Sequence, residues 1–207
     1  LAKEYAFLLD NGISIVTANK TANSIDYDYY HKLFALQRNK VYYSYEATVG
    51  AGLPILSTIK DLLNAGDEIL EIEAMLSGTL GYIFNLLSKD TFLSTAIKQA
   101  MAEGYTEPDP RDDLSGFDVL RKLVILIRET GKIIESKEVE KEDLLSNNLL
   151  KLKTLDEFFQ SLQEVDYNFE QKRSEAEKQG KKLKYIAEYK NGNARISVKS
   201  VGKESPF

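Results

Sequence analysis

The chain has 207 residues, of which 43% are hydrophobic and 29% are charged, and its formal net charge is −5. This length can bury a full core, and the acidic balance argues against a nucleic-acid partner, which would need a basic stripe. The chain contains no Cys, so disulfides, thiolate metal sites and cysteine nucleophiles are excluded. No stretch approaches the roughly 20 apolar residues of a membrane span. We therefore expect a cytoplasmic protein with no membrane partner.

The first 48 residues alternate between helical and strand-like segments. We predict the end of a helix over 1–10, a strand at 13–16, a helix from Asn23 or Ser24 to 37, and a second strand at 41–45. Helix and strand alternating at this spacing are typical of a parallel α/β sheet.

The rest of the chain is richer in helices. We predict a helix from Pro54 to Gly66, a half-buried strand at 67–75, helices at 79–88 and 92–103, a loop at 104–113, an amphipathic helix at 114–130, and mostly helical structure over 135–180 with an apolar stripe of Leu155, Phe158, Phe159 and Leu162. Alternating residues on both sides of Asn191-Gly192 predict a terminal hairpin.

The predicted loop at 104–113 is acidic and stiff. It contains Glu107, Asp109, Asp112 and Asp113, and two of the four prolines of the chain. Proline fixes its own φ and drives the preceding residue towards extended geometry. Such a loop, next to the start of a helix, can hold carboxylates against a bound ammonium group.

Asp118 and Lys122 stand four residues apart on the following helix, so both project from one face. On spacing alone the favoured interpretation is a surface ion pair, worth about 0.2–0.5 kcal/mol. A functional pair is the alternative that the spacing leaves open.

Thr17-Ala-Asn-Lys20 follows a predicted strand, and polar residues at the carboxyl end of a parallel strand often face a ligand. An ordinary strand-to-helix turn with a capping Asn explains these residues equally well. The chain has no complete G-x-G-x-x-G segment, and its single histidine, His31, favours neither a serine triad nor a zinc site.

Four segments together resemble one enzyme family. Gly104-Tyr-Thr-Glu-Pro-Asp-Pro-Arg-Asp-Asp-Leu-Ser-Gly116, followed by Asp118 and Lys122, closely resembles the signature of homoserine dehydrogenases. Segments 16–20, 46–54 and 76–84 are similar to three further blocks of that family, in the same order. Segments 28–31 and 62–67 look like the bifunctional branch, in which an aspartokinase precedes the dehydrogenase.

The resemblance implies an NAD- or NADP-dependent interconversion of L-aspartate 4-semialdehyde and L-homoserine. Lys122 would donate the proton to the carbonyl oxygen, and Glu107 and Asp118 would bind the amino acid, with Asp113 close by. Because a neutral lysine must accept that proton in the reverse direction, we expect homoserine oxidation to be faster at alkaline pH.

The resemblance also implies two further ligands. The cofactor would face the Thr17-Ala18 backbone, Asn19, Lys20 and Gly104. A sodium-type monovalent cation would lie between Glu46 and the backbone carbonyls of Val49, Ala51 and Leu53.

The fold implied is α/β. It has a remnant of a Rossmann-type dinucleotide domain at 1–48 and an α+β catalytic domain at 49–207, whose mixed sheet is covered by helices. We expect a homodimer or a higher homo-oligomer. The glycine-rich start of the dinucleotide domain is not in the chain, so the isolated piece could instead act as a non-catalytic assembly or regulatory module.

Overall fold

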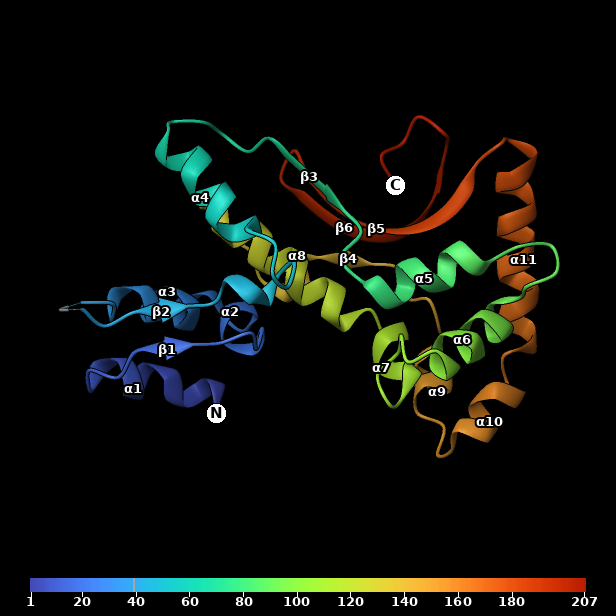
Figure 1. Ribbon diagram of the computed structural model, residues 1–207, viewed down its shortest axis with the longest axis horizontal. Helices are drawn as coiled ribbons and strands as arrows, with labels where there is room; N and C mark the ends of the chain where they lie inside the picture. The colour runs from blue at the N-terminus through green and yellow to red at the C-terminus, as the bar shows by residue number, and fades with distance from the viewer. Residues whose placement is uncertain (39) are drawn as a thin grey trace. The chain divides into compact units, whose positions relative to one another are not determined.

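The computed structural model describes residues 1–38 and 40–207. These residues form two units, whose elements are labelled in Figure 1. Unit 1 contains Leu1–Leu76, Val119–Glu140 and Glu188–Arg195, and unit 2 contains Ser77–Asp118, Lys141–Ala187 and Ile196–Phe207. The predicted division into a dinucleotide-domain remnant at 1–48 and a catalytic domain at 49–207 stays a prediction.

Unit 1 begins with a small α/β layer. A 3-10 turn, Ala2–Glu4, leads into α1 (Tyr5–Asp10), β1 (Ile15–Val16), α2 (Thr21–Ser24), α3 (Tyr27–Ala35) and β2 (Tyr43–Ser44). The two strands are parallel, with Ile15 opposite Tyr43, and α1 packs against α3 and β1. The predicted parallel strand pair is therefore confirmed.

The predicted helix cap at Asn23 or Ser24 is wrong. Both residues are buried inside α2, and the cap of α3 is Asp26, whose carboxylate accepts the backbone N–H of Tyr29 at 2.8 Å. The predicted single helix is thus two helices, because an aspartate is an equally good N-cap and starts a second one.

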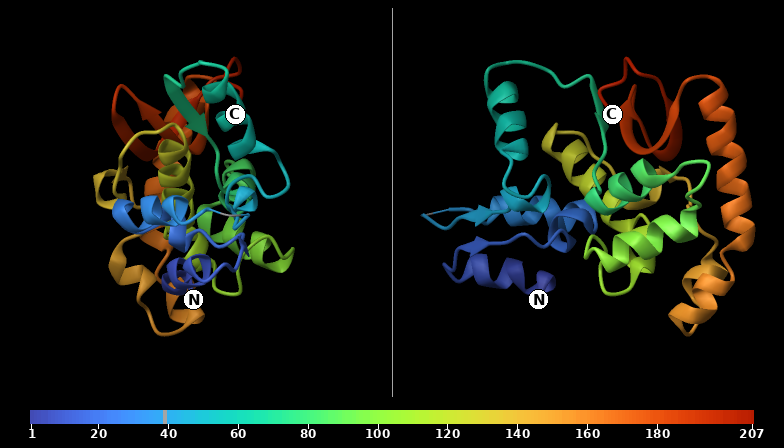
Figure 2. Two further views of the ribbon diagram at one scale, coloured as in Figure 1. Left: turned by 90° about the vertical axis from the view of Figure 1, so that its left-hand side faces the viewer. Right: turned by 45° about the vertical axis from the view of Figure 1, so that its right-hand side comes forward.

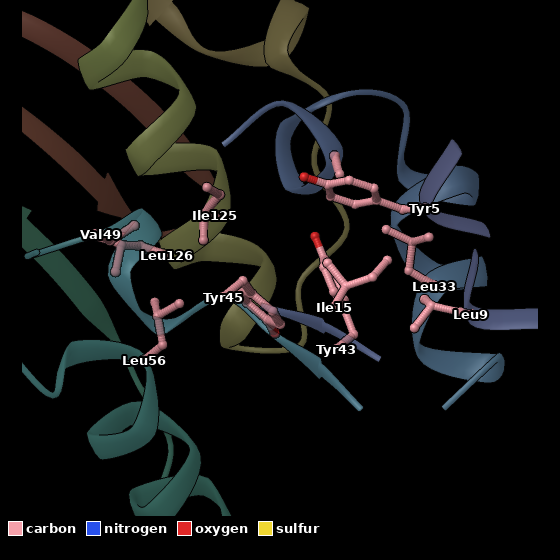
Figure 3. Close-up of a cluster of buried hydrophobic side chains, with 11 residues drawn as sticks. Tyr5, Leu9, Ile15, Leu33, Tyr43, Tyr45, Val49, Leu56, Ile125 and Leu126 are labelled. Atoms are coloured by element: carbon pink, nitrogen blue, oxygen red, sulfur yellow. The ribbon is translucent and has the colours of Figure 1, made fainter. Parts of the chain in front are cut away.

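The core of unit 1 joins this layer to a long helix, α8 (Phe117–Glu129). Figure 3 shows the buried side chains of this core, which are Tyr5, Leu9, Ile15, Ala22, Leu33, Tyr43, Tyr45, Val49, Leu56, Ile125 and Leu126. The Tyr43 and Tyr45 rings lie 5.0 Å apart, centroid to centroid. Residues Ile125 and Leu126 come from the buried side of α8, so this helix and the first strands share one core.

Unit 1 also contains η2 (Glu46–Thr48), α4 (Ile55–Asn64), β3 (Glu71–Ala74) and η3 (Ser136–Glu138). Pro54 is the N-cap of α4 rather than its first residue. Strand β3 is shorter than the predicted 67–75, and Leu70, within the predicted strand, lies outside it and is 73% exposed.

A second sheet has the strand order β3-β5-β6-β4. Strands β5 (Lys182–Lys190) and β6 (Asn193–Val201) form the predicted hairpin, and β4 (Glu140–Lys141) is an edge strand that the sequence did not predict. The φ angles of Asn191 and Gly192 are 51° and 80°, which is the left-handed pair that a tight hairpin turn needs. The predicted mixed α/β class is confirmed.

Unit 2 is mainly helical. Its helices are α5 (Gly78–Leu86), α6 (Leu93–Ala102), α7 (Pro110–Leu114), α9 (Asn147–Leu150), α10 (Leu155–Gln160) and α11 (Gln163–Lys178). Helix α6 packs against α5 and α11, as Figure 2 shows. Phe158 and Leu162 of the predicted stripe are fully buried. None of the helices in the described residues is long and apolar enough to cross a membrane.

Candidate functional site

The carboxylates of the acidic loop in unit 2 differ in their partners. Asp109 caps α7, since its Oδ1 accepts the backbone N–H of Arg111 at 3.0 Å. The Arg111 Nε also donates to both carboxylate oxygens, at 2.8 and 3.0 Å. These hydrogen bonds from Arg111 lower the pKa of Asp109. Asp109 therefore stabilises the loop rather than facing a ligand.

Asp113 holds the loop from the other side. Its Oδ2 accepts the backbone N–H of Glu107 at 2.8 Å, so Asp113 fixes the backbone of the residue that the resemblance assigns to substrate. The side chains of Glu107, Asp112 and Asp118 are exposed. The three predicted substrate-binding carboxylates thus lie in one unit, with Glu107 in the loop, Asp113 in α7 and Asp118 in the first turn of α8.

Two residues on α5 fix the start of this loop. Thr79 Oγ1 donates to the carbonyl of Tyr105 at 2.7 Å, and the Tyr82 and Tyr105 rings stack with centroids 4.4 Å apart. Gly104 ends α6 with φ +75°, a left-handed conformation that favours glycine. Thr79 and Tyr82 were not among the predicted site residues, although both lie in segment 76–84, which resembles the family.

Lys122 lies in unit 1, one helical turn after Asp118 on α8. It is half-buried, and its Nζ donates to the carbonyl of Leu76 at 2.7 Å. Leu76 follows the end of β3, so this bond ties the ammonium to the strand. A charged donor held by a backbone carbonyl has a fixed direction, as a proton donor requires.

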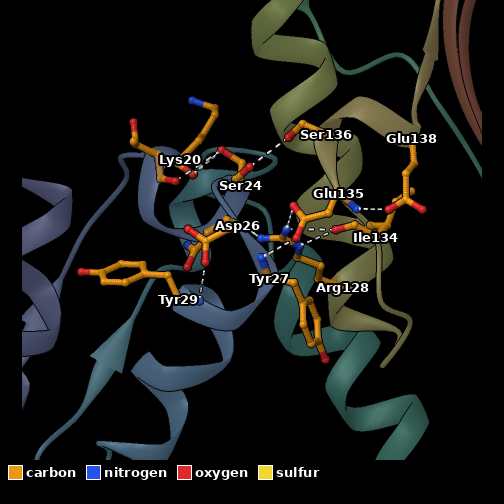
Figure 4. Close-up of polar contacts among 12 residues, drawn as sticks. Lys20, Ser24, Asp26, Tyr27, Tyr29, Arg128, Ile134, Glu135, Ser136 and Glu138 are labelled. Atoms are coloured by element: carbon orange, nitrogen blue, oxygen red, sulfur yellow. Dashed lines mark hydrogen bonds and ion pairs between the residues drawn. The ribbon is translucent and has the colours of Figure 1, made fainter.

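Buried Arg128 anchors the last turn of α8 within unit 1 (Figure 4). Its guanidinium, with no exposed side-chain surface, donates to the carbonyls of Asn23 at 2.9 Å and Ile134 at 2.9 and 3.1 Å. It also pairs with the Glu135 carboxylate at 3.3 Å. Burial lowers the pKa of Arg128, and the charge of Glu135 opposes that shift.

The neighbouring Glu129 makes a second buried anchor. Its carboxylate accepts the hydroxyls of Tyr45 at 2.5 Å and Tyr30 at 3.2 Å, and the Lys60 Nζ lies 3.3 Å away. Burial and the negative charge of Glu129 raise the pKa values of Tyr30 and Tyr45 well above the ordinary value for tyrosine. Together the two anchors tie α8, which carries Lys122, to α2, to α3 and to Tyr45, the residue after β2.

Thr17 to Lys20 follow the carboxyl end of β1. The Thr17 N–H continues the strand pairing to the Ser44 carbonyl at 2.9 Å, and Asn19 Oδ1 accepts the N–H of Thr21 at 2.9 Å. This bond closes a turn before α2, whose N-cap is Lys20 without a side-chain cap, so Asn19 forms an ordinary strand-to-helix turn but does not cap the helix. Asn19 and Ala18 are nevertheless exposed at the strand end, where doubly wound sheets bind ligands. Figure 4 shows Lys20 at the start of α2.

The loop after Glu46 curls tightly. The Glu46 carboxylate accepts the backbone N–H groups of Leu56 at 2.9 Å and Ser57 at 3.0 Å, at the start of α4. Gly50 and Ala51 both have left-handed φ, 79° and 51°. Across the described part of the chain, no group of three or more His, Cys, Asp or Glu side chains could hold a metal ion. A cation here would depend mainly on backbone carbonyls.

Comparison with known proteins decides the family. Residues 54–207 match the family model described as homoserine dehydrogenase. The chain belongs to the homoserine dehydrogenase family. It is 43% identical over 210 residues to bifunctional aspartokinase/homoserine dehydrogenase 2, chloroplastic, of Zea mays, covering 100% of this chain and 23% of that protein. It is 40% identical over 204 residues to the bifunctional enzyme of Haemophilus influenzae, covering 98% and 25%. This homoserine dehydrogenase chain thus spans about a quarter of the length of these relatives.

Solved structures agree with the family fold. A Candida auris protein described as of unknown function is 34% identical, with a TM-score of 0.93 over 100% of this chain and 60% of its own. A candidate homoserine dehydrogenase of Archaeoglobus fulgidus is 26% identical, with a TM-score of 0.74 over 99% and 57%. A hyperthermophilic archaeal homoserine dehydrogenase in complex with NADPH is 24% identical, with a TM-score of 0.69 over 99% and 54%, and supports the fold alone. The predicted family is confirmed.

Proposed function

We propose that the longer protein containing this chain interconverts L-aspartate 4-semialdehyde and L-homoserine with a nicotinamide cofactor. The observation that carries the proposal is the family match, combined with an acidic loop and a helix that present the expected residue types. The assembly or regulatory role considered above has no comparable observation in its favour.

The carboxylates of unit 2 would bind the amino acid. The substrate ammonium needs negative partners, and Glu107 and Asp118 are exposed carboxylates. Asp113 would act indirectly, by holding the backbone of Glu107 through the hydrogen bond that it accepts from the Glu107 N–H. Asp109 and Arg111 neutralise one another, so the loop offers a limited set of charges to a small zwitterion.

Lys122 would hold and move the proton. As the aldehyde is reduced, negative charge develops on its oxygen, and an ammonium at Nζ stabilises and then protonates that oxygen. The Leu76 carbonyl accepts a hydrogen bond from this ammonium and so fixes where Nζ lies. In the oxidative direction a neutral Lys122 would take the proton from the homoserine hydroxyl.

The cofactor would lie against Thr17, Ala18, Asn19, Lys20 and Gly104. When bound, the nicotinamide cofactor supplies or accepts the hydride. The exposed strand end at Ala18 and Asn19 fits such a ligand, because backbone and small polar groups there lie at the carboxyl edge of a parallel pair. The residues that would choose between NAD and NADP are not among these five.

A monovalent cation would be held by Glu46 and the carbonyls of Val49, Ala51 and Leu53. The left-handed φ angles of Gly50 and Ala51 curl the backbone that carries these carbonyls, which favours the proposal. Oxygen donors of this kind suit a hard cation. Glu46 would contribute a weakened charge, since it also accepts two N–H groups of α4.

For the longer protein we propose a fused aspartokinase, as the names of the plant and bacterial relatives suggest, and a homodimer or higher homo-oligomer. The cytoplasm stays the expected compartment, although the Zea mays relative is named as chloroplastic.

The test is homoserine oxidation by the full-length protein, followed by the absorbance of reduced nicotinamide with NAD or NADP. We expect Glu107→Gln and Asp118→Asn to raise the homoserine KM about tenfold or more, the scale of one hydrogen bond to a charged group. Asp112→Asn is the matched control, an exposed carboxylate on α7 between the two, and should leave the KM unchanged. A folded, cofactor-bound protein without turnover would contradict the proposal and favour the assembly or regulatory role.

A further inference from the structure

A single turn in unit 2 joins α7, which follows the loop of Glu107 and carries Asp113, to α8, which carries Asp118. Helix α7 ends at Leu114. The N–H of its C-cap, Ser115, donates to the Arg111 carbonyl at 2.9 Å, and the N–H of Gly116 donates to the Asp113 carbonyl at 3.2 Å. Gly116 has φ +69°, which reverses the chain into α8. This turn therefore sets how the Asp113 side of the loop is oriented relative to Asp118.

Lys141, at the edge strand β4, reaches this turn. Its Nζ donates to the Ser115 carbonyl at 3.0 Å, pairs with the Asp143 carboxylate, and lies 5.5 Å from the centroid of the Phe117 ring. The Lys141 side chain is only 13% exposed, whereas that of Asp143 is 52% exposed. A mostly buried ammonium is thus directed at the carbonyl of the C-cap of α7.

Tyr185 of β5 closes the turn from another side. A Cβ added at Gly116 would lie 2.8 Å from the Tyr185 Oη, so the buried tyrosine leaves room only for glycine. The Tyr185 hydroxyl donates to the Glu142 carbonyl at 3.0 Å. Burial raises the pKa of Tyr185, so this hydroxyl stays protonated and can donate.

Glu142 fixes the base from which Lys141 projects. Its N–H donates to the Ile196 carbonyl at 2.8 Å, and its Oε2 accepts the N–H of Val198 at 2.9 Å. Both partners belong to β6. With the bond from Tyr185, three contacts hold the residue next to Lys141 in place.

We propose that Lys141, supported by Tyr185, is a positioning residue that holds the Ser115-Gly116 turn and so orients Asp118 with respect to Glu107. The inference rests on the proposed function, because it assigns both carboxylates to the substrate ammonium. Lys141 does not touch the substrate in this account. Its effect should therefore fall on the binding of homoserine, while chemistry and cofactor binding stay unchanged.

The decisive variant is Lys141→Met in the full-length protein. Methionine keeps the length and the apolar contact with Phe117 but has no N–H to give Ser115, and the exposed Asp143 stays solvated. We expect the homoserine KM to rise about tenfold, which is the scale of one hydrogen bond to a charged group. The kcat and the cofactor KM should stay within about twofold of the wild type. Lys141→Arg should restore most of the KM. Lys172→Met is the control, because Lys172 pairs with Glu142 at 2.9 Å without reaching the turn.

A double-mutant cycle separates positioning from simple stabilisation. If Lys141 acts through Asp118, adding Lys141→Met to Asp118→Asn should cost no further kcat/KM. An unchanged homoserine KM would overturn the proposal, and so would an equal rise in the cofactor KM with a lower melting temperature. If Lys141→Met does not fold, Tyr185→Phe serves instead, and we expect it to raise the homoserine KM about threefold. An unchanged homoserine KM in Tyr185→Phe would then overturn the proposal. A wild-type protein that does not oxidise homoserine would instead refute the proposed function, and this inference with it.

Discussion

Replacing Arg128 with methionine tests whether buried charge holds α8 in place. The guanidinium is fully buried and donates to two buried carbonyls and to Glu135, whose side chain is 32% exposed. Without it, the carbonyls of Asn23 and Ile134 lose a donor that water cannot easily replace. Each such loss costs about 1–3 kcal/mol.

For the two carbonyls together the loss is about 2–6 kcal/mol, and we expect Arg128→Met to lower the free energy of unfolding by that amount, because the partly exposed Glu135 stays hydrated and adds little. Urea unfolding followed by tyrosine circular dichroism measures it, because the chain has 12 Tyr and no Trp. The control is Arg38→Met, since the Arg38–Asp10 pair is 63% and 58% exposed. That change should cost less than about 1 kcal/mol. An Arg128→Met chain as stable as the control would refute the anchoring role.

Three smaller predictions concern stability, two in unit 1 and one in unit 2. Burial and the charge of Glu129 raise the pKa of Tyr45 above its ordinary value of 10.0, so the free energy of unfolding should be greatest below pH 10 and fall as the pH rises further. Thermal melts at alkaline pH should show this fall. Tyr45→Phe should make the fall smaller. Gly50→Ala should lower stability by about 1–3 kcal/mol, because φ is +79° and the new Cβ would lie 2.5 Å from Ile55; an unchanged melting temperature would show that the loop relaxes freely. Ser77→Ala should cost about 1 kcal/mol by removing the N-cap of α5, while Ser77→Asp should not, as urea titrations of the two variants would report.

The sequence predicted those elements whose signals are local. The hairpin depends on two adjacent left-handed residues at Asn191-Gly192, and α8 depends on apolar residues at three- and four-residue steps. Strand β4 has only two residues, Glu140 and Lys141, and owes its existence to β6. No local pattern could have predicted it.

The residues of the candidate site were predictable from the family resemblance, whereas the residues that support them were not. Lys122, Glu107 and Asp118 were found through their resemblance to the family, because spacing alone favoured a surface ion pair. Their roles stay predictions. The residues that support them were missed, since Lys141 meets Ser115 across 26 positions and Arg128 meets Asn23 across 105. Pairings at such separations leave no periodic trace in a single sequence.

Homoserine oxidation by the full-length protein and its Lys122→Ala variant tests the central claim most directly. Arg121→Ala, an exposed neighbour on α8, is the matched control and should keep its activity. We expect the wild type to turn over faster at alkaline pH, and Lys122→Ala to lose about two to four orders of magnitude in kcat, as loss of a general acid–base predicts. A folded Lys122→Ala variant with wild-type kcat and pH profile would contradict the account.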